Sequence, residues 1–251
     1  MGHHISYSAS PAMQNAAFAA AGLGGWTYDL LDVPEPGVSA AVAGLRADDV
    51  AGANVTIPHK LAAADLVDEL DEAARATGAV NTIVNRAGSL LGSNTDVAGI
   101  RAALAELELE VTPALRVLVL GGGGSARAAA AAVGAARTVF AMRRPVGDLP
   151  APAVAWDERA ELARDSDLVI NCTPLGRDGE EVLSPGDLPP AGAVLDLVYA
   201  GGGTPLVREA RRRGLRTADG WTVLLEQGAA AFAAWTGLPP PKDAMREALR
   251  P

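Results

Sequence analysis

Three short stretches of the sequence gather polar side chains that serve no obvious helical or strand purpose. They are residues 6–11 (Ser-Tyr-Ser-Ala-Ser-Pro), 54–60 (Asn-Val-Thr-Ile-Pro-His-Lys) and 92–96 (Gly-Ser-Asn-Thr-Asp). A fourth, residues 78–82 (Gly-Ala-Val-Asn-Thr), ends a predicted helix and opens a predicted strand. Together they supply hydroxyls, amides, one amine and one carboxylate. That set of groups suits a small polyhydroxylated acid rather than a lipid or a metal ion.

The amine in the second stretch stands out against the composition. Only two of the 21 cationic residues are lysines, at Lys60 and Lys242, and the others are arginines. Lys242 follows three prolines at the start of a predicted terminal helix, which suits a solvated surface position. Lys60 lies among the polar stretches, so it raises the question of which chemistry needs an amine there.

A run of glycines points to a nucleotide. Residues 121–124 are all glycine, Ser125 follows, and the run lies between a predicted strand at 116–120 and a predicted helix at 126–133. Glycines let the backbone approach a ligand closely, and a helix N-terminus favours a pyrophosphate. The pattern is G-x-G-G-x-A, a variant of the dinucleotide fingerprint G-x-G-x-x-G. A tight turn without a ligand is the alternative.

The end of the next predicted strand, 138–142, indicates which dinucleotide the chain binds. Chains that bind NAD usually carry an acidic residue there, which binds the ribose 2′-hydroxyl. This chain carries Arg143 and Arg144 instead. A guanidinium can bind a phosphate through two hydrogen bonds, so the pair favours NADP. Two solvated loop arginines are the alternative, and the Arg-rich composition weakens the inference.

The elements of the second half are read from its apolar runs. Strand, glycine loop, helix and strand form a βαβ unit, and further strands are predicted at 167–171 and 193–198. Continuous rather than alternating apolar residues are typical of a parallel sheet covered on both faces. The sequence therefore predicts an α/β protein with a Rossmann-type, NADP-binding domain at residues 98–228.

The first half alternates less clearly. Strands are predicted at 26–31, 53–57 and 79–84, and a helix at 61–76. A helix at 100–107 could link the halves, and the helical segments at 228–235 and 243–249 follow the last strand. We predict an N-terminal α/β substrate-binding and catalytic domain at residues 1–97, with residues 229–251 packing back on it.

Composition limits the class of protein. The 251 residues carry a formal charge of −9, which argues against nucleic acid or an anionic membrane as a partner. No apolar run approaches the length of a membrane helix, and no secretory signal is visible. The one cysteine, Cys172, excludes an internal disulfide and suits the cytoplasm. Monomer and homodimer both stay open.

The motifs together resemble those of the shikimate dehydrogenase family over essentially the whole chain. The resemblance rests on the order and spacing of several short patterns, each weak alone. They are S-x-S-P-x-x-x-N (Ser8 to Asn15), N-V-T-x-P-x-K (Asn54 to Lys60), G-A-V-N-T (Gly78 to Thr82), N-T-D-x-x-G (Asn94 to Gly99), the glycine loop, N-x-T-P-x-G (Asn171 to Gly176), D-x-x-Y (Asp196 to Tyr199) and Q-G-A-x-x-F (Gln227 to Phe232).

The resemblance implies an oxidoreductase that reduces 3-dehydroshikimate to shikimate reversibly with NADPH, in aromatic amino-acid and chorismate biosynthesis. It implies that Lys60 and Asp96 are catalytic. Ser8 and Ser10 would bind the substrate carboxylate, while Thr56, Asn81 and Gln227 would hold its hydroxyls beside Tyr199. The implied NADP-binding residues are Glu72, Gly121, Gly122, Gly123, Gly124, Ser125, Arg143, Arg144, Thr173, Leu197 and Gly220.

The implied reaction explains why a lysine amine is needed at position 60. Negative charge develops on a ketone oxygen as hydride reaches its carbon, and an ammonium can both stabilise that charge and donate a proton. Arginine is a poor proton donor. Simpler roles remain: Lys60 could be a surface residue, Asp96 a helix cap, and Ser8 with Ser10 a turn before Pro11.

Several positions depart from the family pattern. His3 and His4 stand where the family has Asn-Pro, and we assign them no metal-binding role. Cys172 is read as a small apolar filler. The family also has a strand before Gly2, so either the start of this chain was assigned late or the strand is absent. A missing strand would leave an unpaired edge in the first domain.

Two other functions stay open. One is a paralogue that acts on quinate or an aminoshikimate, possibly with NAD, because substrate preference depends on few contacts. The other is a non-catalytic nucleotide-binding regulatory module. The presence of both Lys60 and Asp96 argues against the module.

Overall fold

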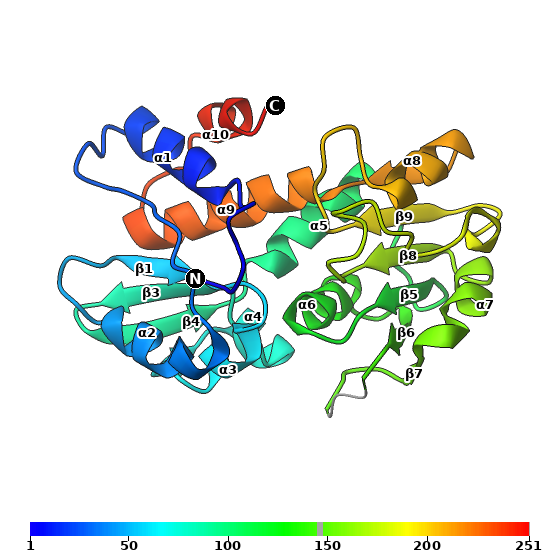
Figure 1. Ribbon diagram of the computed structural model, residues 1–251, viewed down its shortest axis with the longest axis horizontal. Coiled ribbons are helices and arrows are strands. Elements are labelled where there is room, and N and C mark those ends of the chain that lie inside the picture. Colours follow the sequence, from blue (N-terminus) through cyan, green and yellow to red (C-terminus); the bar gives the residue numbers. More distant parts are fainter. Residues whose placement is uncertain (145–147, 251) are drawn as a thin grey trace. The chain divides into compact units, whose positions relative to one another are not determined.

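The computed structural model describes residues 1–144 and 148–250 and divides into two compact units (Figure 1). Unit 1 comprises Met1–Ala98 and Leu224–Pro251, and unit 2 comprises Gly99–Val223. The predicted return to the first domain, after residue 228, is therefore a few residues late. The boundary falls inside one continuous helix, α9 (Gly220–Thr236), where no loop or glycine cluster marks it in the sequence.

Unit 2 is built on a six-stranded sheet in the order β10-β9-β8-β5-β6-β7, and every neighbouring pair is parallel (Figure 1). Numbered from β5, this is the strand order of a doubly wound dinucleotide-binding fold. The strands are β5 (Arg116–Leu120), β6 (Arg137–Met142), β7 (Ala153–Ala155), β8 (Leu168–Asn171), β9 (Ala193–Asp196) and β10 (Arg216–Ala218). The helices are α6 (Gly124–Val133), α7 (Arg159–Arg164), α8 (Pro205–Arg212), η2 (Trp156–Glu158) and η3 (Pro185–Asp187).

The central strands of this sheet are buried on both faces. Residues 117–120 of β5, and all of β8 and β9, are buried, which explains their unbroken apolar runs. Leu118, Leu120 and Val169 belong to a core cluster that the helices cover. From β5 the chain continues to β6 and β7 on one side of the sheet. It then crosses back to β8, next to β5, and continues to β9 and β10 on the other side. Ligands of such folds bind at the carboxyl ends of the strands beside this reversal.

Unit 1 contains a smaller, four-stranded sheet in the order β1-β3-β4-β2. β3 (Thr82–Arg86) is antiparallel to both β1 (Gly52–Asn54) and β4 (Ser89–Ser93), and β2 (Glu69–Leu70) is parallel to β4. Around the sheet lie α1 (Ser10–Ala20), η1 (Glu35–Gly37), α2 (Val38–Gly44), α3 (Lys60–Ala64) and α4 (Glu72–Thr77). The helix α5 (Asp96–Glu106) leads from unit 1 into unit 2.

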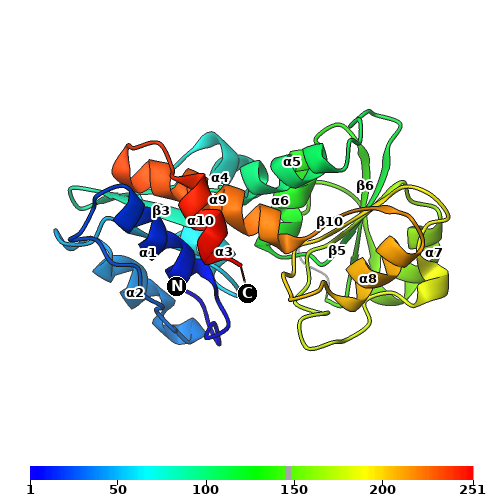
Figure 2. The same cartoon turned by 90° about the horizontal axis from the view of Figure 1, so that it is seen from above.

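The C-terminal segment, residues 224–251, belongs to unit 1. α10 (Lys242–Ala248) lies beside α1 in both views (Figures 1 and 2). In α9, the Trp235 indole donates to the carbonyl of Ile83 at 2.9 Å, which joins this helix to β3. The Phe18 and Phe232 rings pack with their centroids 5.7 Å apart. Within the described part of the chain, no helix is both long and apolar enough to cross a membrane.

The strand predicted at 26–31 is wrong. Among the residues that the structure describes, the only ladder pairing of this region is a parallel bridge between Gly2 and Asp32. The backbone of Tyr28 bonds instead to the Asn15 side chain, which accepts from its N–H at 2.8 Å and donates to its carbonyl at 3.0 Å. An apolar run becomes a strand only where a neighbouring backbone supplies partners.

The edge expected to lack a first strand is partly occupied by the chain's own first residues. The Met1 amine donates to the carbonyl of Asn54, and the Met1 carbonyl accepts from the N–H of Thr56. On its other side Gly2 exchanges hydrogen bonds with Leu31 and Val33. Residues 1 and 2 therefore lie between residues 54–56 on one side and residues 31–33 on the other.

The single helix predicted at 61–76 is also wrong, because three elements divide it. α3 ends before Asp65, β2 follows, and α4 begins after Asp71. The Asp71 carboxylate accepts the N–H of Ala74 at 2.7 Å, which caps α4, while its own N–H bonds to Gly92 on β4. Capping and strand pairing override the helical spacing of the apolar residues.

Candidate active site

Two of the polar stretches meet at an ion pair. Lys60 is the first residue of α3 and Asp96 the first residue of α5. The Lys60 Nζ lies 2.5 Å from Asp96 Oδ2, and the two side chains are only 12% and 11% exposed. Lys60 is therefore not an ordinary surface residue. Asp96 is not solely a helix cap either, because its carboxylate binds the side chains of Lys60 and Asn81.

Asn81, just before β3, holds this pair in place. Its amide nitrogen lies 2.8 Å from Asp96 Oδ1, 2.9 Å from Thr95 Oγ1 and 3.3 Å from Gln227 Oε1. Its oxygen accepts the backbone N–H of Thr95 at 2.7 Å and the hydroxyl of Thr82 at 3.0 Å. Asn81 is 2% exposed. A buried amide with both ends bonded has a fixed orientation, so it also fixes the Asp96 carboxylate.

Gln227 enters this group from α9, far away in the sequence. It is buried, and its own amide nitrogen donates to the carbonyl of Leu224 at 3.0 Å within the same helix. Unit 1 thus brings together four of the predicted substrate or catalytic residues: Lys60, Asn81, Asp96 and Gln227.

The remaining predicted substrate residues of unit 1 lie in loops. Thr56 follows β1 and is half-buried, with its backbone bonded to Met1. Ser8 and Ser10 are half-buried at the start of α1, and Ser8 Oγ accepts the N–H of Ser10 at 3.3 Å. The pair does form a turn before Pro11, and this turn also presents two hydroxyls at one place.

The glycine loop lies at the carboxyl end of β5, as predicted. Gly121 has φ +111°, a conformation that side chains rarely allow, and its N–H bonds to Ala141 on β6. A Cβ at Gly121 would lie 3.3 Å from the Thr173 methyl, so two predicted cofactor residues are neighbours. Gly123 is the N-cap of α6, and no side chain of the described residues caps this helix. The N-terminus of a helix carries backbone N–H groups and a positive dipole end, which favour an anionic ligand.

The other predicted cofactor residues fall into three places. Arg143 and Arg144 are exposed and follow β6. A Cβ at Gly220, the first residue of α9, would overlap the Leu197 carbonyl, so these two residues are packed together. Glu72 is exposed at the start of α4 and belongs to unit 1, unlike the rest of the set.

Tyr199, predicted to lie beside the substrate, belongs to unit 2. Its ring packs against Trp221 with the centroids 4.8 Å apart, and the Trp221 indole donates to the Ala200 carbonyl.

Sequence reasoning gave no role to a buried network at the carboxyl ends of β8 and β9. The Asp196 carboxylate accepts hydrogen bonds from the Asn171 amide (2.9 Å), the Val198 N–H (3.0 Å) and the Thr204 hydroxyl (2.6 Å). Asn171 also accepts the Thr173 hydroxyl at 2.7 Å. Burial raises the pKa of Asp196 to about 6, although the three hydrogen bonds act in the opposite direction. The motifs N-x-T-P and D-x-x-Y, which contain Asn171 and Asp196, are the sequence signal that could have pointed to this network.

Comparisons with known proteins agree with this arrangement. Residues 1–83 match the substrate-binding domain of shikimate dehydrogenase, and residues 220–250 match the shikimate 5′-dehydrogenase C-terminal domain. A shikimate dehydrogenase (NADP(+)) from Rubrobacter xylanophilus is 45% identical, and the match covers 99% of this chain and 93% of that protein. The chain belongs to the shikimate dehydrogenase family.

Solved structures of this family share the fold. Shikimate 5-dehydrogenase from Thermus thermophilus, in complex with NADP(H) and shikimate, superimposes with a TM-score of 0.86 at 34% identity, covering 98% of this chain and 95% of that one. Quinate dehydrogenase from Corynebacterium glutamicum, in complex with NAD, gives a TM-score of 0.84 at 28% identity, with coverage of 98% and 95%. The fold thus serves more than one substrate and cofactor.

Proposed function

We propose that this member of the shikimate dehydrogenase family catalyses the reversible, NADPH-dependent reduction of 3-dehydroshikimate to shikimate. The observation that carries the proposal is the largely buried ion pair of Lys60 and Asp96, held by Asn81 in a chain of this family. An amine and a carboxylate kept 2.5 Å apart can orient one hydroxyl and exchange its proton.

Lys60 is the proton donor in the reductive direction. When bound, NADPH supplies the hydride that the ketone carbon accepts. The ammonium of Lys60 stabilises the negative charge that develops on the ketone oxygen and then donates a proton to it, which completes the alcohol. In the oxidative direction the neutral amine takes this proton back. Asp96 keeps Lys60 at the reacting oxygen, and Asn81 keeps Asp96 in place.

The other polar residues of unit 1 bind the substrate in this proposal. Ser8 and Ser10 present two hydroxyls on one turn, which suits a carboxylate. Thr56, Asn81 and Gln227 bind ring hydroxyls. The support is that these side chains are polar and half-buried or buried, and that Ser8, Asn81 and Gln227 make side-chain hydrogen bonds.

The residues of unit 2 fit NADP(H), the cofactor in the names of the relatives. The glycine loop leads into the N-terminus of α6, whose dipole favours a pyrophosphate, and Gly121 leaves room beside Thr173. Arg143 and Arg144, exposed after β6, bind the 2′-phosphate. Leu197 and Gly220 pack at the same edge of the sheet. We also propose a cytoplasmic location, since the one cysteine suits a reducing compartment.

Initial rates distinguish this function from its alternatives. Reduction of NADP⁺ is followed with shikimate, and parallel reactions replace shikimate by quinate or NADP⁺ by NAD⁺. We expect shikimate with NADP⁺ to give the highest kcat/KM. A preference for quinate or NAD⁺ would indicate the paralogue. Binding of NADP⁺ without turnover on either acid would indicate a non-catalytic module.

A further inference from the structure

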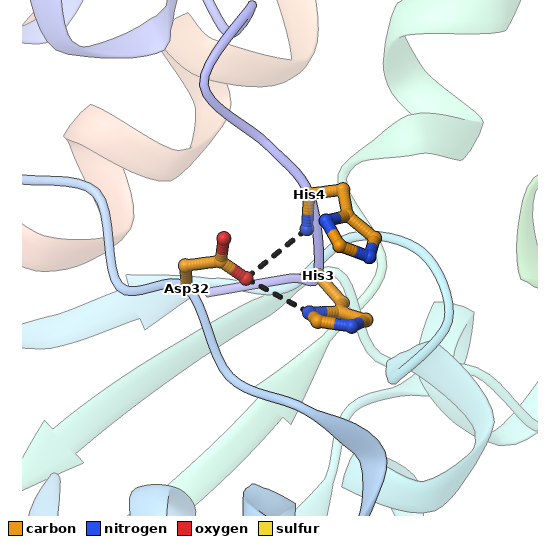
Figure 3. A group of neighbouring side chains, drawn as sticks. All are labelled: His3, His4 and Asp32. Carbon is orange, nitrogen blue, oxygen red and sulfur yellow. Dashed lines mark hydrogen bonds and ion pairs between the residues drawn. The ribbon is translucent and has the colours of Figure 1, made fainter.

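Two imidazoles and a carboxylate come together on the surface of unit 1. His3 and His4 come from the N-terminal segment, and Asp32 comes from the segment that pairs with it (Figure 3). One ligand atom from each of the three side chains can be chosen so that all lie within 4.8 Å of one another. The sequence assigned these histidines no metal-binding role, because they stand where the family has Asn-Pro, and it did not place Asp32 beside them.

The backbone of His4 is what turns the two rings to the same side. Successive side chains of an extended segment point in opposite directions. His4 instead has φ +56°, in the left-handed region that residues other than glycine seldom adopt. The two ring centroids consequently lie 3.8 Å apart. Adjacent histidines in this conformation can offer both imidazoles to one ion.

Asp32 is held towards the same point by both histidines. Its Oδ1 lies 3.0 Å from His3 Nδ1 and accepts the backbone N–H of His4 at 3.1 Å, and Figure 3 shows both contacts. Next to these contacts, the backbone of Gly2 bonds to Leu31 and Val33, which fixes the distance between the N-terminal segment and the segment that carries Asp32. The carboxylate is therefore placed by the local fold and not only by a flexible surface contact.

The site is open to solvent, so an ion can reach it. The His3 and Asp32 side chains are 34% and 55% exposed, and His4 is exposed. Ligand atoms on one zinc ion lie about 3.3 Å apart, given bonds of roughly 2.0–2.2 Å. The three side chains would need to close by only about 1.5 Å, which rotation of exposed rings allows.

We propose that His3, His4 and Asp32 form a surface site for a divalent transition-metal ion, best fitted to Zn²⁺, with water completing the coordination. Two imidazole nitrogens and one carboxylate oxygen suit zinc and its neighbours, whereas Mg²⁺ and Ca²⁺ require mainly oxygen ligands. The ion joins residues 3 and 4 to residue 32, so it stabilises the packing of the N-terminal segment. This inference does not depend on the proposed enzymatic function.

Calorimetric titration of the full chain, prepared without a polyhistidine tag, tests the site. We expect one Zn²⁺ per chain, at least tenfold weaker binding in His4→Ala and Asp32→Asn, and binding that weakens as the pH falls, because the imidazoles must be neutral. Asp29→Asn removes an exposed acid three residues away and should bind as the wild type does. Co²⁺, used as a spectroscopic probe, should show ligand-field absorption that His4→Ala loses.

Two results would overturn the proposal. One is no stoichiometric binding of Zn²⁺ to the wild-type chain. The other is binding that His4→Ala and Asp32→Asn leave unchanged, which would place the ion elsewhere. Thermal unfolding gives a further check, because an ion that binds the folded chain raises the midpoint temperature with its concentration. This increase should be absent in His4→Ala.

Discussion

The two units prepare their proposed binding residues by different means. In unit 1, side chains hold side chains: Lys60, Asp96 and Asn81 are linked by hydrogen bonds of 2.5 and 2.8 Å, and Gln227 joins from another helix. In unit 2, the backbone offers the groups, through the uncapped start of α6 and the glycine loop after β5. The proposed site in unit 1 therefore depends on the identity of its side chains. The proposed site in unit 2 depends mainly on where its strands end.

This difference matches the two tasks that we propose. Proton transfer requires a particular group at a particular atom, so an amine has to be oriented by neighbours that cannot rotate. A pyrophosphate is recognised by N–H groups and a helix dipole that any sequence can supply, provided that side chains are small. Single substitutions should thus be most harmful in unit 1 and should mainly change cofactor preference in unit 2.

Among the residues that hold the ion pair, the largest effect is expected from Asn81→Ala. This change removes the buried hydrogen bonds of Asn81 to Asp96 Oδ1 and to the Thr95 N–H, which should cost about 2–3 kcal/mol of unfolding free energy. It should also lower kcat on the order of 100-fold, because Lys60 and Asp96 lose their fixed orientation. Chemical denaturation and initial rates measure the two effects.

Asn85→Ala, on the same strand, is the matched control. Asn85 bonds to the carbonyls of Ala47 and Val50 and to the N–H of Gly88, so its loss should destabilise the fold without lowering kcat. Equal losses of kcat in both variants would show that the Asn81 effect is only structural.

A smaller effect is expected in unit 2 from replacing Arg143 and Arg144 together by serine. The KM for NADPH should rise on the order of tenfold or more, while the KM for NADH changes little, because only NADPH carries the 2′-phosphate. Arg137→Ser, at the opposite end of β6 and exposed, should leave the preference unchanged. An unaltered NADPH to NADH ratio in the double variant would refute a phosphate-binding role.

The smallest effect concerns pH and the buried network of unit 2. The folded pKa of Asp196, about 6, lies above its ordinary value of 3.8, so the folded chain binds the proton more tightly than the unfolded chain does. The stability from this proton is full below about pH 4 and is lost as the pH rises through 6. Asp196→Asn cannot titrate, so the variant should lack this dependence, worth about 2 kcal/mol between pH 4 and 7. Identical pH profiles of unfolding free energy would contradict this assignment.

The sequence predicted the elements of unit 2 better than those of unit 1. Residues 116–120 form a strand with the predicted bounds, because a central parallel strand is apolar on both faces. Residues 26–31 were also read as a strand from their apolar and aromatic side chains, but they form none, since their bonding partner is the Asn15 side chain. Local patterns carry no information on which distant backbone is available.

The same limit applies to the site residues. The spacing of motifs led to Lys60, Asn81, Asp96 and Gln227, and the structure places these four together. The motifs could not show that the Asp196 carboxylate is buried beneath three donors, or that Asp32 lies beside His3 and His4, because these contacts join residues up to 29 positions apart. The family resemblance names residues by their order in the chain, and only the fold brings in their neighbours.

The most direct test of the account compares the two lysines. Lys60→Arg keeps the charge at Asp96 but lacks a transferable proton near neutral pH, whereas Lys242→Arg changes an exposed lysine that pairs with Glu226. In shikimate-dependent reduction of NADP⁺, we expect Lys60→Arg to lose at least about 100-fold in kcat with little change in KM. Lys242→Arg should match the wild type. Turnover of Lys60→Arg close to the wild-type rate would contradict proton transfer by Lys60.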